Sequence, residues 1–350
     1  MVEPPPLNVF DYERLAAERL DPGAYAYYAG GANDELTLAD NVEAFRRWQL
    51  RPRVLVDVSE PSTATTVLGH EIAMPLLVAP VAFQRVAHPD GEVGAARAAA
   101  AAGTIFCLST LATSSPEEVA ATGAQRWFQL YVFRDEAISL DLASRARDAG
   151  FTALVLTVDT AVRGRRERDY RTGFAIPPEI TIPAVGRGGV TPHEALEMVS
   201  SSLSWRDVER FASRVGLPVV LKGVLTAEDA RLACGHGAAA LVVSNHGGRQ
   251  LDGVPATIDA LPEVVDAVAG RMEVLVDGGV RRGTDVVRAL ALGARAVLAG
   301  RAPLWGLAVD GEAGARRVLE LLRDELTAAL QLVGAPTPDA VTRAHVQRRS

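Results

Sequence analysis

At 350 residues, of which 48% are hydrophobic and 23% charged, the chain is long enough to bury the core of one large α/β domain or of two smaller ones. This composition excludes a disordered or fibrous protein. The net charge of −7, without a stripe of Lys and Arg, argues against nucleic acid as a partner.

The N-terminal 15 residues contain acidic residues and prolines where a signal peptide would be basic and then apolar, so we expect no export. Every apolar stretch is interrupted well before the roughly 20 residues that a membrane span needs, so we expect no membrane partner. Cys107 and Cys234 lack metal-ligand spacing, and we expect packing residues in a reducing compartment and no metal. The C-terminal HVQRRS is not a peroxisomal address, and the Ala, Gly and Arg bias favours a bacterial cytoplasm.

The first part of the chain is predicted to be helical. Residues 11–20 and 32–48 have helical character, and a Pro-rich extended stretch follows them. We interpret residues 1–74 as an N-terminal helical cap segment rather than as an independent domain, with the barrel itself over residues 75–350.

From residue 75 onward, short apolar runs alternate with amphipathic segments, several of which end in glycine. The runs are nearly continuous in apolar residues, as parallel strands buried on both faces should be. The eight candidate strands are residues 75–82, 104–109, 127–132, 153–159, 218–223, 240–245, 273–278 and 296–300. Their number and spacing predict an α/β protein with a (β/α)8 TIM barrel, which we favour over a doubly wound sheet. Residues 174–203 are long for a loop and rich in Pro and Gly, and we interpret them as a mobile lid after the fourth strand.

Polar side chains stand at almost every predicted strand end, where barrel enzymes carry their active sites. Burying such groups without partners would cost roughly 1–3 kcal/mol each, so the pattern indicates a site rather than packing. The residues are Ser109, Gln129, Tyr131, Thr157, Asp159, Lys222, Ser244, Asn245, His246, Asp277, Gly300 and Arg301.

Two Gly-containing turns follow the last two predicted strands, at residues 277–285 and 299–303, and each leads into a helix. Backbone N–H groups in these turns, together with Arg281 or Arg301, are typical of a phosphate site, although either turn alone would also fit a simple tight turn.

The segment SNHGGRQLD (residues 244–252) places His246 and Arg249 three residues apart on one loop. An imidazole base beside a guanidinium suits a small carboxylate substrate, and Asp159 is available to stabilise an imidazolium. A single histidine is more often structural, but the other five histidines of the chain lack this setting.

At these residues the chain resembles the FMN-dependent (S)-2-hydroxy acid oxidase and dehydrogenase family, which includes glycolate oxidase, lactate oxidase, the lactate dehydrogenase flavocytochromes and mandelate dehydrogenase. The resemblance covers nearly the whole chain. It is carried by residues 27–41, 51–59, 79–92, 108–115, 128–132, 156–169, 221–230, 244–252 and 277–285.

The resemblance implies that FMN lies across the barrel mouth and that the protein is a homotetramer. The ring and ribityl contacts implied are Pro80, Val81, Ala82, Ser109, Gln129, Thr157, Lys222 and Ser244. The ribityl and phosphate contacts implied are Asp277, Gly279, Arg281, Gly300 and Arg301. Lys222 would stabilise the negative charge that the flavin ring acquires on reduction.

For the substrate, the resemblance assigns Tyr27, Arg166 and Arg249 to the carboxylate and Tyr131 to the substrate oxygen. His246, supported by Asp159, would remove either the Cα proton or the hydroxyl proton, and both routes stay open.

Two positions bear on the substrate side chain. Leu111 stands where glycolate oxidase has tryptophan, and Ala82 stands where mandelate enzymes tend to have glycine. Both favour lactate or a longer aliphatic acid, whereas residues 78–85 and 127–131 also resemble hydroxymandelate oxidases.

The leading hypothesis is an oxidase that passes electrons to O2 and releases a 2-oxo acid and hydrogen peroxide. It rests on the expected lack of a haem domain before residue 1 and of an apolar insertion in residues 174–203. The alternatives are a dehydrogenase that uses a quinone or carrier protein and a monooxygenase that decarboxylates the oxo acid. A non-catalytic barrel is disfavoured because the candidate base His246 and the carboxylate-binding Arg249 are both present. A nicotinamide enzyme is disfavoured because no G-x-G-x-x-G opens a helix after the first strand.

Overall fold

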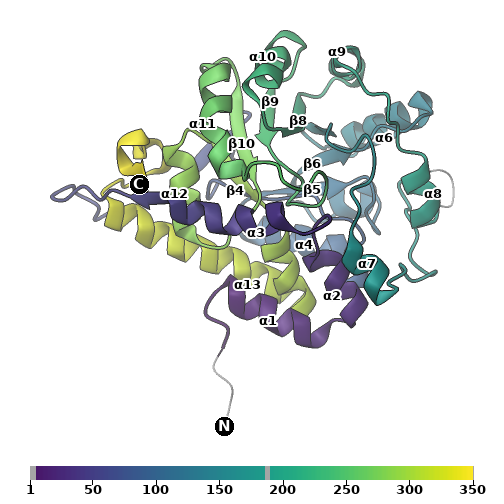
Figure 1. The fold of residues 1–350 in the computed structure, drawn as a ribbon, viewed down its shortest axis with the longest axis horizontal. Helices are drawn as coiled ribbons and strands as arrows, with labels where there is room; N and C mark the ends of the chain where they lie inside the picture. Colours follow the sequence, from purple (N-terminus) through teal and green to yellow (C-terminus); the bar gives the residue numbers. More distant parts are fainter. Residues whose placement is uncertain (1–4, 186–189, 350) are drawn as a thin grey trace.

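Eight parallel strands close into a barrel in the computed structural model, which describes residues 5–185 and 190–349 (Figure 1). The strands are β4 (Leu76–Val78), β5 (Ile105–Ser109), β6 (Gln125–Leu130), β7 (Leu154–Thr157), β8 (Val219–Val224), β9 (Ala240–Val243), β10 (Glu273–Asp277) and β11 (Ala296–Ala299). They pair in chain order, and β11 pairs with β4 to close the barrel. The predicted (β/α)8 barrel is therefore confirmed.

Alternate residues of each strand serve two different cores. Leu77, Cys107, Trp127 and Val155 point into the barrel, where their side chains are wholly buried. Their chain neighbours face the surrounding helices in a second, larger core. The strands are therefore apolar on both faces, which is why their sequences lack the alternation of a one-sided sheet.

Several barrel strands end earlier than the sequence predicted, and two of them, β4 and β7, bear on the site. The predicted strand at residues 75–82 leaves the sheet after Val78, and Phe83 then adopts a left-handed backbone with φ of 58°. The predicted strand at residues 153–159 leaves the sheet after Thr157. The residues beyond both ends are free to face the barrel mouth.

A helix or helical segment follows every barrel strand. These helices are α4 (Gly91–Ala101), α5 (Pro116–Ala120), α6 (Glu136–Asp148), α9 (Trp205–Val215), α10 (Ala227–Gly235), α11 (Thr257–Val268), α12 (Gly283–Ala291) and α13 (Arg301–Val333). A short antiparallel hairpin, β2 (Thr65–Val67) with β3 (His70–Ile72), contributes Val67 and Ile72 to the barrel interior. No described helix is both long enough and apolar enough to cross a membrane.

The N-terminal region forms α1 (Val9–Arg19), α2 (Pro22–Ala29) and α3 (Leu36–Glu43), and α1 packs along α13 (Figure 1). The predicted helix over residues 32–48 was wrong at both ends, because α3 begins only at Leu36 and ends at Glu43. The Asp252 carboxylate accepts hydrogen bonds from the N–H groups of Leu36 and Thr37, so a distant loop determines where this helix begins. After Glu43 the chain forms a 3-10 turn and then β1 (Trp48–Leu50), which pairs with β12 (Val346–Arg348). The division at residue 74 remains our proposal.

The segment after β7 contains α7 (Glu167–Thr172) and α8 (Pro192–Glu197). Single bridges join Ile182 to Val190 and Phe133 to Val199. Residues 186–189 of the predicted lid lie outside the described residues. The mobility of the segment stays a prediction.

Candidate active site

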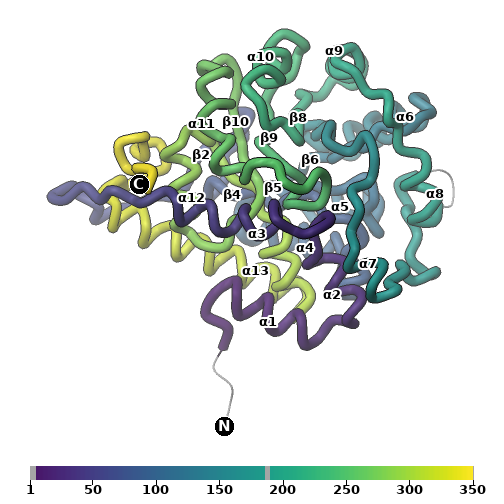
Figure 2. The backbone as a smooth tube through the Cα atoms, in the orientation of Figure 1, coloured from purple at the N-terminus to yellow at the C-terminus, as the bar shows by residue number. Residues whose placement is uncertain are grey.

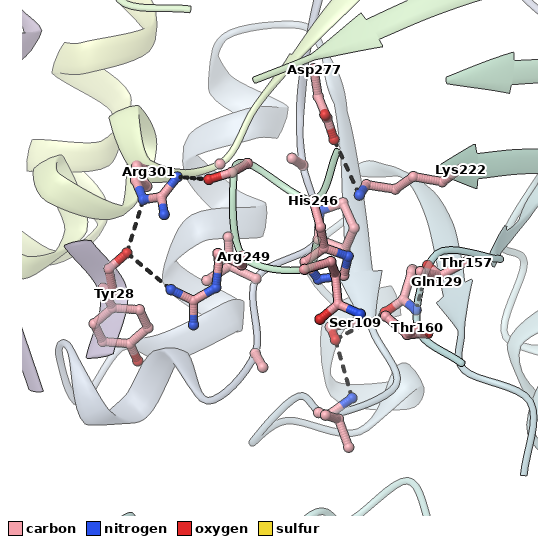
Figure 3. A pocket seen from close by; sticks show the side chains of 18 of the residues that line it. Tyr28, Ser109, Gln129, Thr157, Thr160, Lys222, His246, Arg249, Asp277 and Arg301 are labelled. Carbon is pink, nitrogen blue, oxygen red and sulfur yellow. Dashed lines mark hydrogen bonds and ion pairs between the residues drawn. The ribbon is translucent and has the colours of Figure 1, made fainter. Parts of the chain in front are cut away.

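A cavity of about 260 Å³ opens at the carboxyl ends of the barrel strands (Figure 3). Most of the residues that the sequence singled out line it: Tyr27, Pro80, Val81, Ala82, Ser109, Leu111, Gln129, Tyr131, Thr157, Arg166, Lys222, His246, Arg249, Asp277, Gly279, Arg281, Gly300 and Arg301. The three others lie behind the lining: Asp159 contacts His246, Ser244 contacts Lys222, and Asn245 contacts Asn41. The fold thus brings together residues that are up to 274 positions apart, from Tyr27 to Arg301.

His246 is held between a carboxylate and a phenol. Its Nδ1 lies 3.0 Å from Asp159 Oδ1, and its Nε2 lies 3.2 Å from the hydroxyl of Tyr131. The backbone of His246 has φ of 59°, a left-handed conformation that is unfavourable for a residue with a side chain. Such strain is typical of functional positions, and here it turns the imidazole toward the cavity.

The hydrogen bonds define the tautomer of His246. An ionised Asp159 can only accept, so Nδ1 carries the proton and Nε2 presents its lone pair toward Tyr131. Burial lowers the pKa of His246, Asp159 partly offsets this, and the charge of Lys222 lowers it further. Burial raises the pKa of Tyr131 to about 12, so its hydroxyl stays protonated. The site therefore holds a neutral imidazole whose free nitrogen is able to take a proton.

Asp159 remains ionised although it is buried. Burial would raise the pKa of this carboxyl, but the neighbouring His246 and Lys222 outweigh it and lower the pKa below its ordinary value. Its second oxygen, Oδ2, is buried and has no hydrogen-bond partner among the described residues. The negative charge of Asp159 is therefore available to stabilise a protonated His246.

Lys222 extends from β8 into the base of the cavity, where it is almost completely buried. Its Nζ lies 3.2 Å from Asp277 Oδ2 (Figure 3). The same Nζ donates to Ser244 Oγ at 3.0 Å. Burial alone would lower the pKa of Lys222, but the carboxylates of Asp277 and Asp159 raise it above its ordinary value. A fixed positive charge thus stands at the cavity floor.

A row of uncharged polar groups lines the next strand ends. Ser109 Oγ donates to Gln129 Oε1 at 3.1 Å, and Gln129 Nε2 donates to Thr157 Oγ1 at 2.9 Å. All three side chains are buried, and they lie together in Figure 3. Because they belong to β5, β6 and β7, adjacent strands present them side by side.

The cavity also gathers five arginines: Arg163, Arg166, Arg249, Arg281 and Arg301. Burial and the charge of Arg249 lower the pKa of Arg166 to about 10. Burial, Arg249 and Arg281 lower the pKa of Arg301 well below its ordinary value. Such shifts mean that positive charge is in excess here, and a bound anion would relieve it.

Two of these arginines share one anchor, the C-terminal end of α2. Arg249 Nη1 donates to the carbonyls of Tyr27 and Gly30, and Arg301 donates to those of Tyr28, Gly30 and Gly247. The end of a helix leaves carbonyls unpaired, and cations satisfy them favourably. Every hydrogen bond that Arg249 donates to the described residues uses Nη1, so the other side of its guanidinium faces the cavity.

Sequence reasoning singled out Asn245 as a polar residue at a strand end, but it missed the contacts that hold the loops in place. The amides of Asn41 and Asn245 exchange hydrogen bonds of 2.8 Å, which tie α3 to the loop that carries His246. Gln250 Nε2 donates to the carbonyls of Asp159 and Val162 and so joins that loop to the one after β7. No local pattern identifies such contacts, since the partners are far apart in the chain.

One part of the cavity wall is aliphatic. It contains Leu111 and three residues of the segment after β7, namely Ile176, Leu196 and Val199. The sequence indicated only Leu111 and Ala82 for this wall. Within residues 5–185 and 190–349, no group of three His, Cys, Asp or Glu side chains is arranged to hold a metal ion.

Comparison with known proteins identifies the family to which this arrangement of residues belongs. The family model of FMN-dependent dehydrogenases matches residues 16–348. Glycolate oxidase 3 of Arabidopsis thaliana is 51% identical over 97% of this chain and 95% of the relative. The L-lactate oxidase of Nostoc sp. (strain PCC 7120 / SAG 25.82 / UTEX 2576) is 50% identical over 94% of both chains. A crystal structure of mandelate oxidase with (S)-4-hydroxymandelic acid is 44% identical and superposes with a TM-score of 0.93 over 98% of both chains. The chain therefore belongs to the FMN-dependent dehydrogenase family, and it is an FMN-containing oxidoreductase of the 2-hydroxy acid oxidase type.

Proposed function

We propose that this protein oxidises an (S)-2-hydroxy acid with an aliphatic side chain, lactate or longer, to the 2-oxo acid, with O2 as the electron acceptor and hydrogen peroxide as the second product. The observation that carries the proposal is the position of His246 Nε2. It faces a cavity that also presents the free side of Arg249, and Asp159 lies behind it. A base and an anion clamp at one small cavity suit a 2-hydroxy carboxylate.

The residues of the cavity fit FMN. Excess positive charge at Arg281 and Arg301 lies beside the turn at Gly278 and Gly279 and the beginning of α13, where backbone N–H groups favour a phosphate. Asp277 Oδ1 is buried without a hydrogen-bond partner in the described structure, and it suits a ribityl hydroxyl. Lys222 provides a charge for the ring end of the cavity. When bound, FMN supplies a two-electron acceptor.

The neighbouring glycines support the same assignment. A Cβ at Gly279 would lie 1.9 Å from the Asn41 carbonyl oxygen, and the residue has φ of 82°. Only glycine therefore allows the turn after β10 to approach α3 so closely.

In the proposed reaction, Arg249 and Arg166 hold the substrate carboxylate with Tyr27, whose ring lies 5.1 Å from the Arg249 guanidinium carbon. Tyr131 donates a hydrogen bond to the 2-hydroxyl oxygen. His246 Nε2 takes a proton, either from Cα or from the hydroxyl, and Asp159 stabilises the resulting imidazolium. Two electrons leave the substrate as its C–O single bond becomes a carbonyl, and the transfer to O2 balances them as hydrogen peroxide.

The aliphatic wall supports the choice of substrate. Leu111, Ile176, Leu196 and Val199 offer no hydrogen-bonding group to a second polar function on the substrate. A methyl or longer alkyl group would gain roughly 0.8 kcal/mol per buried CH2 there. The glycolate and lactate oxidases among the relatives act on small aliphatic acids, as their names state.

The structural similarity to mandelate oxidase supports a second candidate, oxidation of (S)-mandelate or 4-hydroxymandelate. A dehydrogenase that passes its electrons to a quinone or a carrier protein is the alternative to an oxidase that uses O2.

One assay compares these possibilities. Oxygen uptake and peroxide are measured with glycolate, (S)-lactate, (S)-2-hydroxybutyrate and (S)-mandelate. The proposal requires stoichiometric peroxide and the highest kcat/KM with (S)-lactate or (S)-2-hydroxybutyrate. Turnover only with an artificial quinone, or fastest turnover with mandelate, would replace it with the corresponding alternative.

We also propose a homotetramer in a bacterial cytoplasm. Val54 and Leu55 are 82% and 103% exposed, and Leu332 is 78% exposed. The backbone N–H of Arg53 donates to the Val333 carbonyl at 3.0 Å, so the two segments lie side by side, as Figure 2 also shows. Large exposed side chains that cluster in this way are typical of an interface between subunits.

A further inference from the structure

Glu92 is a buried carboxylate that the proposed chemistry does not use. It lies in the first turn of α4 and is 0% exposed. Among the described residues it forms no ion pair with Lys, Arg or His, yet four hydrogen-bond donors surround it. A buried charge of this kind is costly unless its hydrogen bonds are complete, so its surroundings call for an explanation.

The four donors come from two different loops at the barrel mouth. From the loop after β4, the Gln84 N–H donates to Oε1 at 3.0 Å. From the loop after β5, the Thr113 N–H donates to Oε1 at 2.9 Å, and the Thr113 and Ser114 hydroxyls donate to Oε2 at 2.5 and 3.2 Å. Glu92 therefore connects the two loops through one carboxylate.

These two loops carry the walls of the cavity that face the substrate side chain. Ala82 and Phe83 precede Gln84, and Leu111 stands two residues before Thr113. The Phe83 N–H donates to the Leu111 carbonyl at 3.0 Å, and the Tyr28 hydroxyl donates to the Phe83 carbonyl at 2.6 Å. The separation of the two walls is thus determined by a small buried network in which Glu92 has the most bonds.

We propose that Glu92 is a positioning residue that fixes the two walls at one separation and so determines which side-chain length the site accepts. The inference rests on the proposed function. An ionised carboxylate is suited to this task because it accepts at about four lone-pair sites and donates nothing. His246 and Asp159 belong to other loops and Lys222 belongs to β8, and none of them makes a hydrogen bond with Glu92. Proton transfer should therefore be insensitive to Glu92, whereas discrimination between substrates should depend on it.

Two variants test the network at different atoms. E92Q keeps the shape and one acceptor oxygen but places a donor against the Thr113 and Ser114 hydroxyls. T113V removes one hydroxyl, which also accepts a hydrogen bond from the Arg85 N–H at 3.3 Å, and keeps the Thr113 N–H bond. E117Q is the matched control, since Glu117 lies on α5 with a half-exposed side chain and pairs with Arg145 of α6 rather than with either loop.

The experiment measures kcat/KM of the FMN-loaded proteins with glycolate and (S)-2-hydroxybutyrate. We expect E92Q and T113V to move the ratio of the two values toward the larger acid by roughly tenfold, the low end of what one methylene is worth in a binding pocket. The acid limb of the pH profile and the visible spectrum should not change in E92Q or T113V. The ratio of the two kcat/KM values should not change in E117Q. T113V provides the test if E92Q fails to fold.

A merely structural role gives a different result. It would lower the melting temperature and reduce kcat/KM equally for both acids, with an unchanged ratio, and this outcome overturns the inference while the proposed function stands. If the unmodified protein oxidises neither acid, the proposed function fails and the inference fails with it.

Discussion

Replacing Asp159 with asparagine tests how the site activates His246. The Asp159 carboxylate lies 3.0 Å from His246 Nδ1, and its second oxygen has no partner in the described structure. D159N keeps the size of the side chain but removes its negative charge. The imidazolium formed during the reaction then loses its closest counter-charge, while Lys222 and Arg166 continue to repel it.

The size of the effect follows from this contact. A hydrogen bond to a charged group contributes about 1.5–3 kcal/mol. Each 1.36 kcal/mol corresponds to a factor of about ten in rate, so kcat/KM should fall by roughly tenfold to a hundredfold.

The direction of the pH effect is also defined. Asp159 raises the pKa of His246 against the lowering effect of burial, so its removal lowers that pKa further. Only neutral His246 accepts the proton, so the acid limb of the kcat/KM profile should move to lower pH in D159N. A limb that moves to higher pH, or a plateau as high as in the unmodified protein, would refute this account of the base.

The assay is steady-state turnover with (S)-lactate across the pH range, normalised to bound FMN. D135N is the matched control. Asp135 caps α6 by accepting from the Ala137 N–H, and asparagine caps helices equally well. Its profile should coincide with that of the unmodified protein.

Three further predictions concern other parts of the molecule. R249K should raise KM for the hydroxy acid by roughly tenfold or more, because one ammonium cannot both donate to the carbonyls at the end of α2 and grip a carboxylate; an unchanged KM would argue against the clamp. L111W should fill the space beside the aliphatic wall and lower kcat/KM for (S)-2-hydroxybutyrate at least tenfold more than for glycolate. An equal loss for both acids would contradict the assignment of this wall. L55D should reduce the mass measured by light scattering below that of a tetramer, since it puts a charge on the exposed segment beside α13, and an unchanged mass would remove this segment from the interface.

The barrel was predictable because each of its strands is buried on two faces. A stretch such as ALVVSN is apolar at every position of β9 and then polar at the mouth, and this single pattern indicates both the strand and the site. The polar residues at the strand ends could be identified for the same reason, since a polar side chain in an otherwise apolar strand is unfavourable unless it has a binding or catalytic role.

The features that the sequence did not predict depend on contacts between distant segments. The beginning of α3 at Leu36 is determined by Asp252, more than 200 residues away, and local propensity over residues 32–48 favoured a longer helix. The same holds for the two arginines on the carbonyls of α2, because the sequence indicates that Arg301 is cationic but not where its guanidinium lies. Glu92 has an unremarkable place in a helical first turn, and only the fold reveals that two loops converge on it.

The most direct test of the central claim is anaerobic mixing of the purified, FMN-loaded protein with (S)-lactate while the visible spectrum is followed. We predict rapid loss of the flavin absorbance, its return when air is admitted, and one equivalent of peroxide for each flavin reoxidised. A protein that takes up no FMN, or whose flavin absorbance is unchanged by every 2-hydroxy acid offered, would contradict the claim that this cavity oxidises 2-hydroxy acids.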